Sequence, residues 1–454
     1  MNDAETVPRP ALYPYVLGIA TELVVEPALG APYLSTAHWL SDFYAWPPDR
    51  RSGWQRQRLR AVVAHAARQV PFYRTLLGSG ADPGSTPLEE LPIVDKARMR
   101  SGTPQFLSQG WEQMPHVVKA TGGTTGDPWR YVLDKNAWAQ MYAAALHFRA
   151  RTGYRYGERM VMLGSPPSLV PGAGSWKSRL RSRLEQRLVS AAGVEIDSRT
   201  SLARARRAGE LRAALWYGYA GTLAAMAAAV IDSGVHVPGP RAILTTSETL
   251  QPTWRAQIEA AFETPVFDEY GCNDGGVLAQ SCRRGRFHVA DNLSLVEVLD
   301  GDTPCPPGVE GEVVVTNLHA RVLPFLRYRV GDRAVAGEGP CPCGQPGNTL
   351  ARVVGRQGDR VQLPGGGELS AVAFGHVFKQ TSSVRRWQVV QDHPRRLRVR
   401  LEVSSGFDRT QEELIRTYFS ERCGQDVQVA LTTSEPIERT LAGKHKVVIR
   451  TFDR

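Results

Sequence analysis

Strands and helices alternate along the middle of this chain, and this alternation limits the possible folds more than any other feature. Short apolar runs at residues 160–163, 242–245 and 265–267 have the length of buried strands. An alanine-rich helix is predicted over 221–230, and a second helix over 253–262. Strand–helix–strand order favours an α/β domain with much parallel sheet.

The rest of the chain divides into regions with different predicted secondary structure. After about residue 290 short β-rich runs dominate, and the last hundred residues combine alternating strands at 387–391 and 397–403 with a helix over 410–419. A chain of 454 residues exceeds one ordinary hydrophobic core. We therefore predict a large N-terminal α/β domain with a β-rich subdomain, residues 1–355, and a small C-terminal α+β domain, residues 356–454.

The net charge and the composition limit the classes of molecule that this protein is expected to bind. The net charge of +10 comes mostly from arginine and favours anionic partners such as nucleotides, coenzyme A or an acidic carrier protein. A basic amphipathic helix is predicted over 175–189. Helix-turn-helix, zinc-finger and basic-aromatic signatures are absent from the sequence, so no nucleic-acid partner is expected. Glutamates and prolines interrupt the apolar stretch 12–34, and the acidic N-terminus does not resemble a signal peptide, so no membrane association is expected.

Six cysteines are too few for a disulfide scaffold, which favours a reduced, cytoplasmic setting. Four soft ligands, Cys282, His288, Cys341 and Cys343, flank a β-rich stretch. Cys₃His is a common shell for structural zinc. The uneven spacing of these residues is less diagnostic than two Cys-x₂-Cys pairs, and the alternative is a set of buried, unreactive thiols.

An eight-residue loop at 121–128 contains three glycines and three threonines. Glycine lets consecutive backbone N–H groups converge on an anion, and threonine hydroxyls add further donors. These are the properties of a polyphosphate-binding loop, although the spacing is not that of a Walker A motif. The alternative is a surface turn between two elements.

Four further motifs follow that loop along the chain, at residues 268–274, 327–332, 355–359 and 439–444. In this order, they resemble the adenylate-forming superfamily of acyl-CoA synthetases and adenylation domains. The runs 68–74, 91–96 and 327–329 are similar to its phenylacetate–CoA ligase branch.

The resemblance implies a role for each matching residue. The β- and γ-phosphates of ATP would be held by Thr121, Gly122, Gly123, Thr124, Thr125 and Gly126. Tyr270 would pack on the adenine with Gly271 beside the nucleotide, and Asp332 would accept hydrogen bonds from the ribose. Arg356 would bind near the phosphate or ribose. Lys444 would swing in on a mobile small domain and stabilise charge on the α-phosphate, while Asp274 would contact Mg²⁺. Taken singly, Asp332, Arg356 and Lys444 could instead be a turn residue, a surface charge and a tail lysine.

Three departures from the family pattern stand out. Asn273 and Asp274 replace the usual Thr-Glu, which makes the carboxylate one methylene shorter. Gly122 replaces a common serine, and Gly358 stands at the domain hinge where an aspartate is frequent. Glycine suits a hinge, because the small domain must rotate between two half-reactions.

The activity that the resemblance implies is ATP- and Mg²⁺-dependent activation of a small-molecule carboxylic acid, expected to be aromatic, as an acyl-adenylate. The acyl group would pass to coenzyme A or to the phosphopantetheine of an acyl or peptidyl carrier protein. The acid pocket is expected to include Tyr219, Ser247, Glu248 and Cys272. Two alternatives remain: activation of another oxygen nucleophile, a phenolic cofactor or small inorganic acid, in secondary metabolism, and a nucleotide-binding protein without catalysis.

Overall fold

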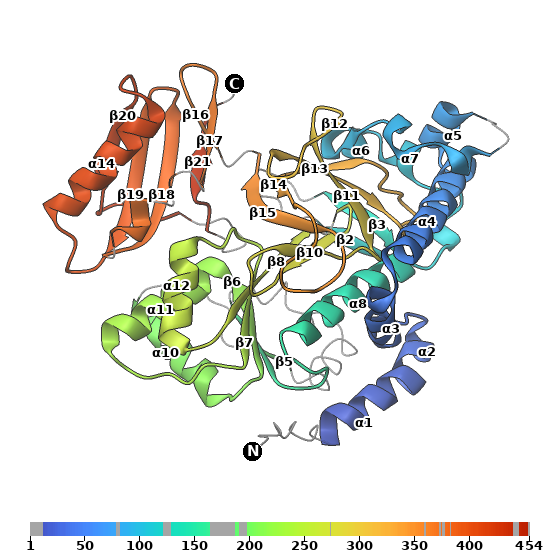
Figure 1. Cartoon of the computed structure of the whole chain (residues 1–454), viewed down its shortest axis with the longest axis horizontal. Coiled ribbons are helices and arrows are strands. Elements are labelled where there is room, and N and C mark those ends of the chain that lie inside the picture. The colour runs from blue at the N-terminus through green and yellow to red at the C-terminus, as the bar shows by residue number, and fades with distance from the viewer. Residues whose placement is uncertain are drawn as a thin grey trace.

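The structure is a computed structural model that describes residues 12–78, 82–120, 129–163, 187–189, 198–272, 274–357, 360–371, 374, 377–381, 383–438 and 445–452. The predicted phosphate loop, Thr121–Gly126, and the predicted catalytic Lys444 lie outside the described residues, as do Asn273 and Gly358. Figure 1 shows a large domain and a small C-terminal domain, so the predicted fold class is confirmed.

A sheet of thirteen strands forms the centre of the large domain. Its parallel half comprises β4 (Met160–Leu163), β5 (Arg187–Val189), β6 (Leu215–Tyr219), β7 (Ala242–Thr246) and β8 (Val266–Cys272). The strand β5 falls at the end of the helix predicted over 175–189. That prediction is wrong for residues 187–189, and the rest of that helix lies outside the described residues.

The other half of this sheet is the predicted β-rich part, and it begins where β9 pairs antiparallel with β8. Its strands are β9 (Val277–Ser281), β10 (Phe287–Val289), β11 (Ser294–Asp300), β12 (Thr303–Pro304), β13 (Glu310–Asn317), β14 (Tyr328–Ala336) and β15 (Thr349–Arg356), with β1 (Val94–Asp95) parallel to β14.

Helices cover the parallel strands. The face formed by Val161, Trp216 and Ile243 packs into one apolar core with α10 (Ser198–Glu210), α11 (Ala220–Ser233) and α12 (Pro252–Phe262). In Figure 1 the other helices of the large domain lie away from α10–α12: α1 (Leu12–Ala20), α2 (Glu26–Leu29), α3 (Leu34–Ala45), α4 (Pro48–Gln69), α5 (Pro71–Leu77), α6 (Lys96–Ser101), α7 (Thr103–Phe106) and α8 (Lys135–Arg151). Of these, α4 to α7 share an apolar core with β13 and β14 of the antiparallel half. Among the described residues, every helix is too short or too polar to cross a membrane.

The small domain contains a four-stranded sheet, a hairpin and one long helix. The sheet joins β18 (Val384–His393), β19 (Arg396–Val403), β20 (Gln428–Thr432) and β21 (Val448–Arg450), and the hairpin joins β16 (Arg360–Gln362) to β17 (Glu368–Ser370). The helix α14 (Arg409–Cys423) buries Phe419 against Phe374 and Phe378. Its N-cap is Asp408, whose carboxylate accepts the N–H of Gln411 at 2.9 Å.

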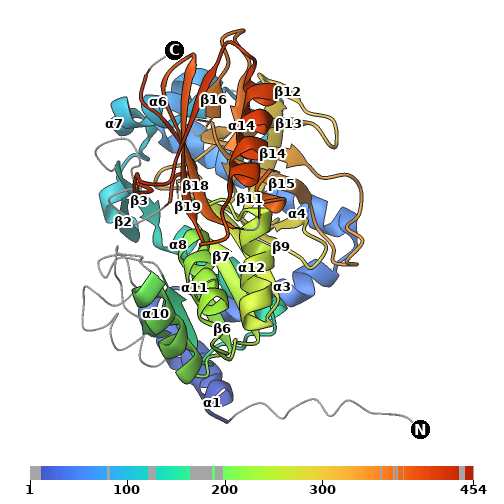
Figure 2. The ribbon, with the colours of Figure 1, turned by 90° about the vertical axis from the view of Figure 1, so that its left-hand side faces the viewer.

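The small domain rests on α11 and α12 of the large domain, as Figure 2 shows. One apolar cluster runs through both domains and includes Leu223 and Ala227 from α11 together with Val389 and Phe378 from the small domain. An ion pair between Arg385 of β18 and Asp232 of α11 adds a polar contact. The two domains are therefore packed on each other through a continuous apolar contact.

Candidate active site and metal centre

The predicted nucleotide-binding residues come from β8, the last parallel strand, and from β14 and β15 of the antiparallel half. Tyr270 on β8 donates its hydroxyl to Asp332 on β14 at 2.9 Å. Asp332 pairs in register with Arg356 on β15, and Arg356 Nε lies 3.9 Å from Asp332 Oδ1. Three residues that come from distant parts of the sequence thus form one group.

Burial shapes the chemistry of this group. Asp332 is 9% exposed, whereas the Arg356 side chain is half exposed. Burial, and next the Asp332 carboxylate, raise the pKa of Tyr270 well above its usual value, so the phenol remains a donor at neutral pH. Asp332 is therefore an oriented acceptor at the edge of the site, and Gly271 beside it is exposed.

Asp274, the predicted metal-contacting carboxylate, is buried in a polar cluster. Tyr328 donates its hydroxyl to Oδ2 at 2.9 Å, and the thiol of Cys272 donates to Oδ1 at 3.3 Å. Lys96 Nζ lies 3.6 Å from Oδ2. Burial, followed by the charge of Asp274, raises the pKa of both Tyr328 and Cys272, so each stays protonated and donates.

Lys96 is a site residue that the sequence analysis did not assign. It is the first residue of α6, and the preceding strand β1 pairs with β14 so that Val94 lies opposite Tyr328. Asp95 caps α6 by accepting the N–H of Arg98 at 2.8 Å. In the sequence, the run 91–96 indicated only the resemblance to the family. The feature that could have pointed to Lys96 is its position directly after Asp95, the residue that caps α6.

Two consecutive glycines fix the turn that follows Asp274. Gly275 and Gly276 have φ values of 89° and 74°, in the left-handed region that favours glycine. A Cβ at 275 would lie 2.7 Å from Val315 Cγ2, and one at 276 would lie 2.3 Å from Asn317 Nδ2. The backbone after Asp274 is therefore pressed against β13, which determines where the carboxylate points.

The residues predicted for the acid pocket follow the ends of neighbouring parallel strands. Tyr219 ends β6 and pairs in register with Thr246, which ends β7 just before Ser247 and Glu248. Ser247 is exposed, and its φ is 67°. The Glu248 carboxylate accepts the N–H of Gly221 on α11 at 2.6 Å and the N–H of His445 from the small domain. Cys272, by contrast, lies in the Asp274 cluster.

A buried polar cluster lies on the same sheet, and sequence reasoning did not assign Arg149, which belongs to it. Tyr217 donates its hydroxyl to Glu269 at 2.7 Å, and the guanidinium of Arg149 lies 4.9 Å from the centre of the Tyr217 ring. Arg149 is 8% exposed and Glu269 is 7% exposed. Tyr217 and Glu269 belong to strands β6 and β8, whose carboxyl ends lie beside the predicted acid pocket.

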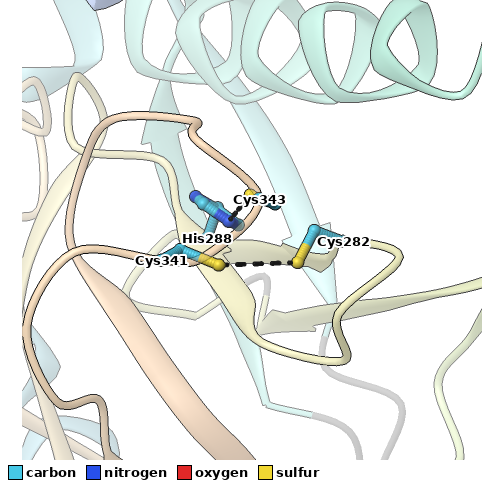
Figure 3. Close-up of side chains that lie close together, drawn as sticks. All are labelled: Cys282, His288, Cys341 and Cys343. Atoms are coloured by element: carbon cyan, nitrogen blue, oxygen red, sulfur yellow. Dashed lines mark hydrogen bonds between the residues drawn. The ribbon is translucent and has the colours of Figure 1, made fainter.

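The four predicted metal ligands converge, as Figure 3 shows. Their ligand atoms all lie within 4.8 Å of one another. Cys282 Sγ and Cys341 Sγ are 3.7 Å apart, and Cys343 Sγ lies 3.2 Å from His288 Nε2. A tetrahedral zinc ion with bonds of about 2.3 Å separates its sulfur ligands by roughly 3.8 Å, so the geometry fits such an ion.

The chain folds these ligands together through a hairpin and a loop. Cys282 follows β9, His288 lies on β10, and Cys341 and Cys343 occupy the loop between β14 and β15. Burial, and next the charge of Arg151, lower the pKa of His288 to about 4, which leaves the neutral imidazole that binds metals. The same loop joins the strands that carry Asp332 and Arg356.

The chain is similar in sequence to several known proteins. A profile of the CapK C-terminal domain matches residues 362–451. The chain is 27% identical over 333 residues to phenylacetate-coenzyme A ligase of Thermus thermophilus, covering 70% of this chain and 73% of that protein. It is 23% identical over 318 residues to protein CapK of Staphylococcus aureus, covering 68% of each.

Solved structures share the fold. A 2-hydroxyisobutyryl-CoA ligase in its postadenylation state gives a TM-score of 0.70 at 20% identity, covering 89% of this chain and 90% of that chain. The same ligase in its thioesterification state gives a TM-score of 0.57. The fold of this chain is that of the adenylate-forming ligases. The relatives named phenylacetate-coenzyme A ligase agree with the branch that the motifs of this chain resemble.

Proposed function

We propose that this protein is an AMP-forming ligase that activates a carboxylic acid with ATP and transfers the acyl group to a thiol. The observation that carries the proposal is the group formed by Tyr270 of β8, Asp332 of β14 and Arg356 of β15. The relatives named as coenzyme A ligases support this reaction class.

Each described residue of the group has a role in holding the nucleotide. Asp332 would accept hydrogen bonds from the ribose hydroxyls, since an ionised carboxylate pairs well with a diol. The Tyr270 ring would pack on the adenine while its hydroxyl holds Asp332 in place. Arg356, half exposed, would reach the phosphate or ribose. The roles of Thr121–Gly126 and Lys444 rest on the sequence motif alone.

Mg²⁺ is expected to arrive with the ATP phosphates. Asp274 can offer it one carboxylate, which is usual where phosphates supply the other ligands. Lys96 lies 3.6 Å from the same carboxylate and would compete with or replace the ion on that side. The chain's own contribution is therefore an oriented carboxylate, held by Tyr328 and Cys272, with a lysine beside it.

The acid is proposed to lie at the carboxyl ends of β6, β7 and β8, near Tyr219, Ser247 and Cys272. An aromatic acid is our preferred substrate, because the relatives include phenylacetate–CoA ligases. Coenzyme A is the preferred acceptor for the same reason, and a phosphopantetheine-bearing carrier protein is the alternative.

The two predicted domains, residues 1–355 and 356–454, are proposed to rotate about the segment that joins them. Gly355 has a φ of 113°, and the last strand of the large sheet ends at Arg356. The first strand of the small domain begins at Arg360. The CapK profile begins at residue 362, which supports a boundary in this segment.

We also propose that Cys282, His288, Cys341 and Cys343 hold a structural zinc ion. A closed shell of four protein ligands leaves no position for substrate, so the ion would stabilise the β14–β15 loop and not take part in the reaction. Metal analysis of purified protein should find about one zinc per chain. Cys341→Ser should lose the metal and lower the melting temperature, whereas Cys305→Ser, outside the cluster, should retain it. Less than about half an equivalent in the unmodified protein would contradict the proposal.

Acid-dependent exchange of labelled pyrophosphate into ATP tests the main proposal. The panel should contain aryl, arylacetic and short aliphatic acids together with nitrite and a phenol. Exchange driven by one class of carboxylate supports adenylation and identifies the substrate class. Exchange driven only by nitrite or the phenol would move the assignment to an unusual oxygen nucleophile. The absence of exchange from protein that binds ATP would refute adenylation.

A further inference from the structure

Glu248 joins three elements through one carboxylate. Its Oε2 accepts the N–H of Gly221 in the first turn of α11 at 2.6 Å, and its Oε1 accepts the N–H of His445 from the small domain. The first of these bonds lies within the large domain, and the second crosses between domains. A carboxylate suits this position, because it can accept from both donors at once and is favoured at a helix N-terminus.

The local backbone is built to bring these groups together. Ser247 has a φ of 67°, a left-handed conformation that is uncommon for serine, and it turns the chain directly after β7. Gly221 allows a close approach from the other side. A Cβ at 221 would lie 3.0 Å from Glu248 Oε2 and 3.2 Å from the Cβ of His445. A side chain on residue 221 would therefore press on both partners.

His445 is held firmly within the small domain. Its ring nitrogen Nε2 lies 3.1 Å from the carbonyl oxygen of Trp387, and its ring packs edge-on against Trp254 of the large domain at 5.3 Å between centroids. The chain then continues into β21, and the carbonyl of Val447, directly before that strand, accepts the N–H of Val389 at 2.8 Å. A bond to the His445 N–H therefore acts on the small domain as a whole.

The buried side chain of Gln388 strengthens this connection. Its amide nitrogen donates to the carbonyls of Glu438 and Lys446, at 2.9 and 2.8 Å. Gln388 thus joins the main chain before and after the sequence motif at 439–444, which ends at the predicted catalytic Lys444. In the sequence, Lys444 directly precedes His445, whose N–H Glu248 accepts.

From these contacts we infer that Glu248 is a positioning residue that selects the domain arrangement in which the acid is activated. This inference rests on the proposed function. The arrangement in the structure resembles the postadenylation state of the related ligase more closely than its thioesterification state. Rotation of the small domain would break the bond to His445 and leave the bond to Gly221 intact, so the carboxylate stabilises one arrangement over the other.

The test compares Glu248→Gln, Gly221→Ala and the control Glu413→Gln, which alters an exposed ion pair within α14. The two N–H donors bond different oxygens of the Glu248 carboxylate, so glutamine offers its carbonyl oxygen to one of them and an NH₂ group, which cannot accept, to the other. Alanine at 221 favours the α11 helix but obstructs His445. Acid-dependent pyrophosphate exchange should fall roughly tenfold or more in both variants, the scale of one lost charged hydrogen bond. Thioester formation from pre-made acyl-adenylate should stay within about twofold of the unmodified protein, and Glu413→Gln should leave both steps unchanged.

Hydrogen exchange of the main chain separates this role from simple capping of α11. In Glu248→Gln, residues 445–452 should exchange faster than in the unmodified protein. Faster exchange confined to the first turn of α11, or an equal loss of both half-reactions, would overturn the inference. If the unmodified protein activates no acid, the proposed function fails, and protection at 445–452 alone decides whether Glu248 holds the small domain.

Discussion

Replacement of Gln388 by leucine should destabilise the small domain strongly. Gln388 is fully buried on β18 and makes four hydrogen bonds. It donates to the carbonyls of Glu438 and Lys446 and accepts from the Glu438 N–H at 3.0 Å and from Arg400 Nη1 at 3.1 Å. Leucine has a similar size but leaves three main-chain groups without this partner.

The magnitude follows from those three groups. Each buried polar group left unpaired costs about 1–3 kcal/mol, and the apolar side chain returns about 1 kcal/mol through burial. The net loss is then on the order of 2–8 kcal/mol, a large part of the stability of a domain of this size. Arg400 retains Glu435 and Glu438 as partners, at 2.9 and 2.8 Å, so its charge stays compensated.

Urea unfolding followed by hydrogen exchange of β18–β21 measures this loss. Gln388→Leu should bring the small-domain transition to a lower urea concentration and expose residues 445–452 to exchange. The matched control is Gln428→Leu, at an exposed position on β20, where the change should stay within about 0.5 kcal/mol. Equal effects of the two substitutions would refute the idea that Gln388 connects the two sides of the motif at 439–444.

Four further predictions concern the site. Tyr270→Phe removes the hydroxyl that holds Asp332 and should raise the KM for ATP several-fold, the scale of about 1 kcal/mol, with a smaller change in kcat in pyrophosphate exchange. Lys96→Ala should slow adenylation roughly tenfold and Lys96→Arg should restore part of the rate; a rate unchanged by Lys96→Ala would remove Lys96 from the site. Lys444→Ala should abolish adenylation while thioester formation from pre-made adenylate survives, and equal loss of both steps would contradict that role. Burial raises the pKa of Asp268 to about 6, above its value in the unfolded chain. The folded state therefore binds the proton more tightly, and the free energy of unfolding falls as the pH rises from about 4 through 6. Asp268→Asn should remove this fall, which unfolding curves at pH 4 and pH 7 measure.

The sequence was most informative where a local pattern determines the structure. The strands at 160–163 and 242–245 and the helix at 253–262 follow from apolar runs that a buried parallel sheet requires, and the structure contains each of them. The boundaries were less accurate. The helix predicted over 410–419 extends over Arg409–Cys423, and its N-cap is Asp408, whose carboxylate accepts the N–H of Gln411.

The site residues that local motifs contain were predicted from the sequence, whereas a site residue that depends on a long-range contact was not. Motif order was sufficient to predict that Tyr270, Asp332 and Arg356 come together. The four predicted metal ligands also converge, whereas the zinc ion stays a prediction. Lys96 was not found, because its contact with Asp274 depends on β1 joining β14, and short parallel pairing leaves almost no periodic signal in the sequence.

Glu248 illustrates the limit most clearly. Sequence reasoning predicted it for the acid pocket, and that role stays a prediction. Its contact with His445 spans 197 residues and exists only when two domains are packed in one arrangement. A residue whose partner depends on the domain arrangement leaves no local pattern in the sequence. The unusual features beside Glu248, the left-handed backbone of Ser247 and the close approach of Gly221, are visible only in the structure. The residues that select between two arrangements of a protein are therefore those that sequence reasoning is least able to find, and the contacts between domains are where they should be sought.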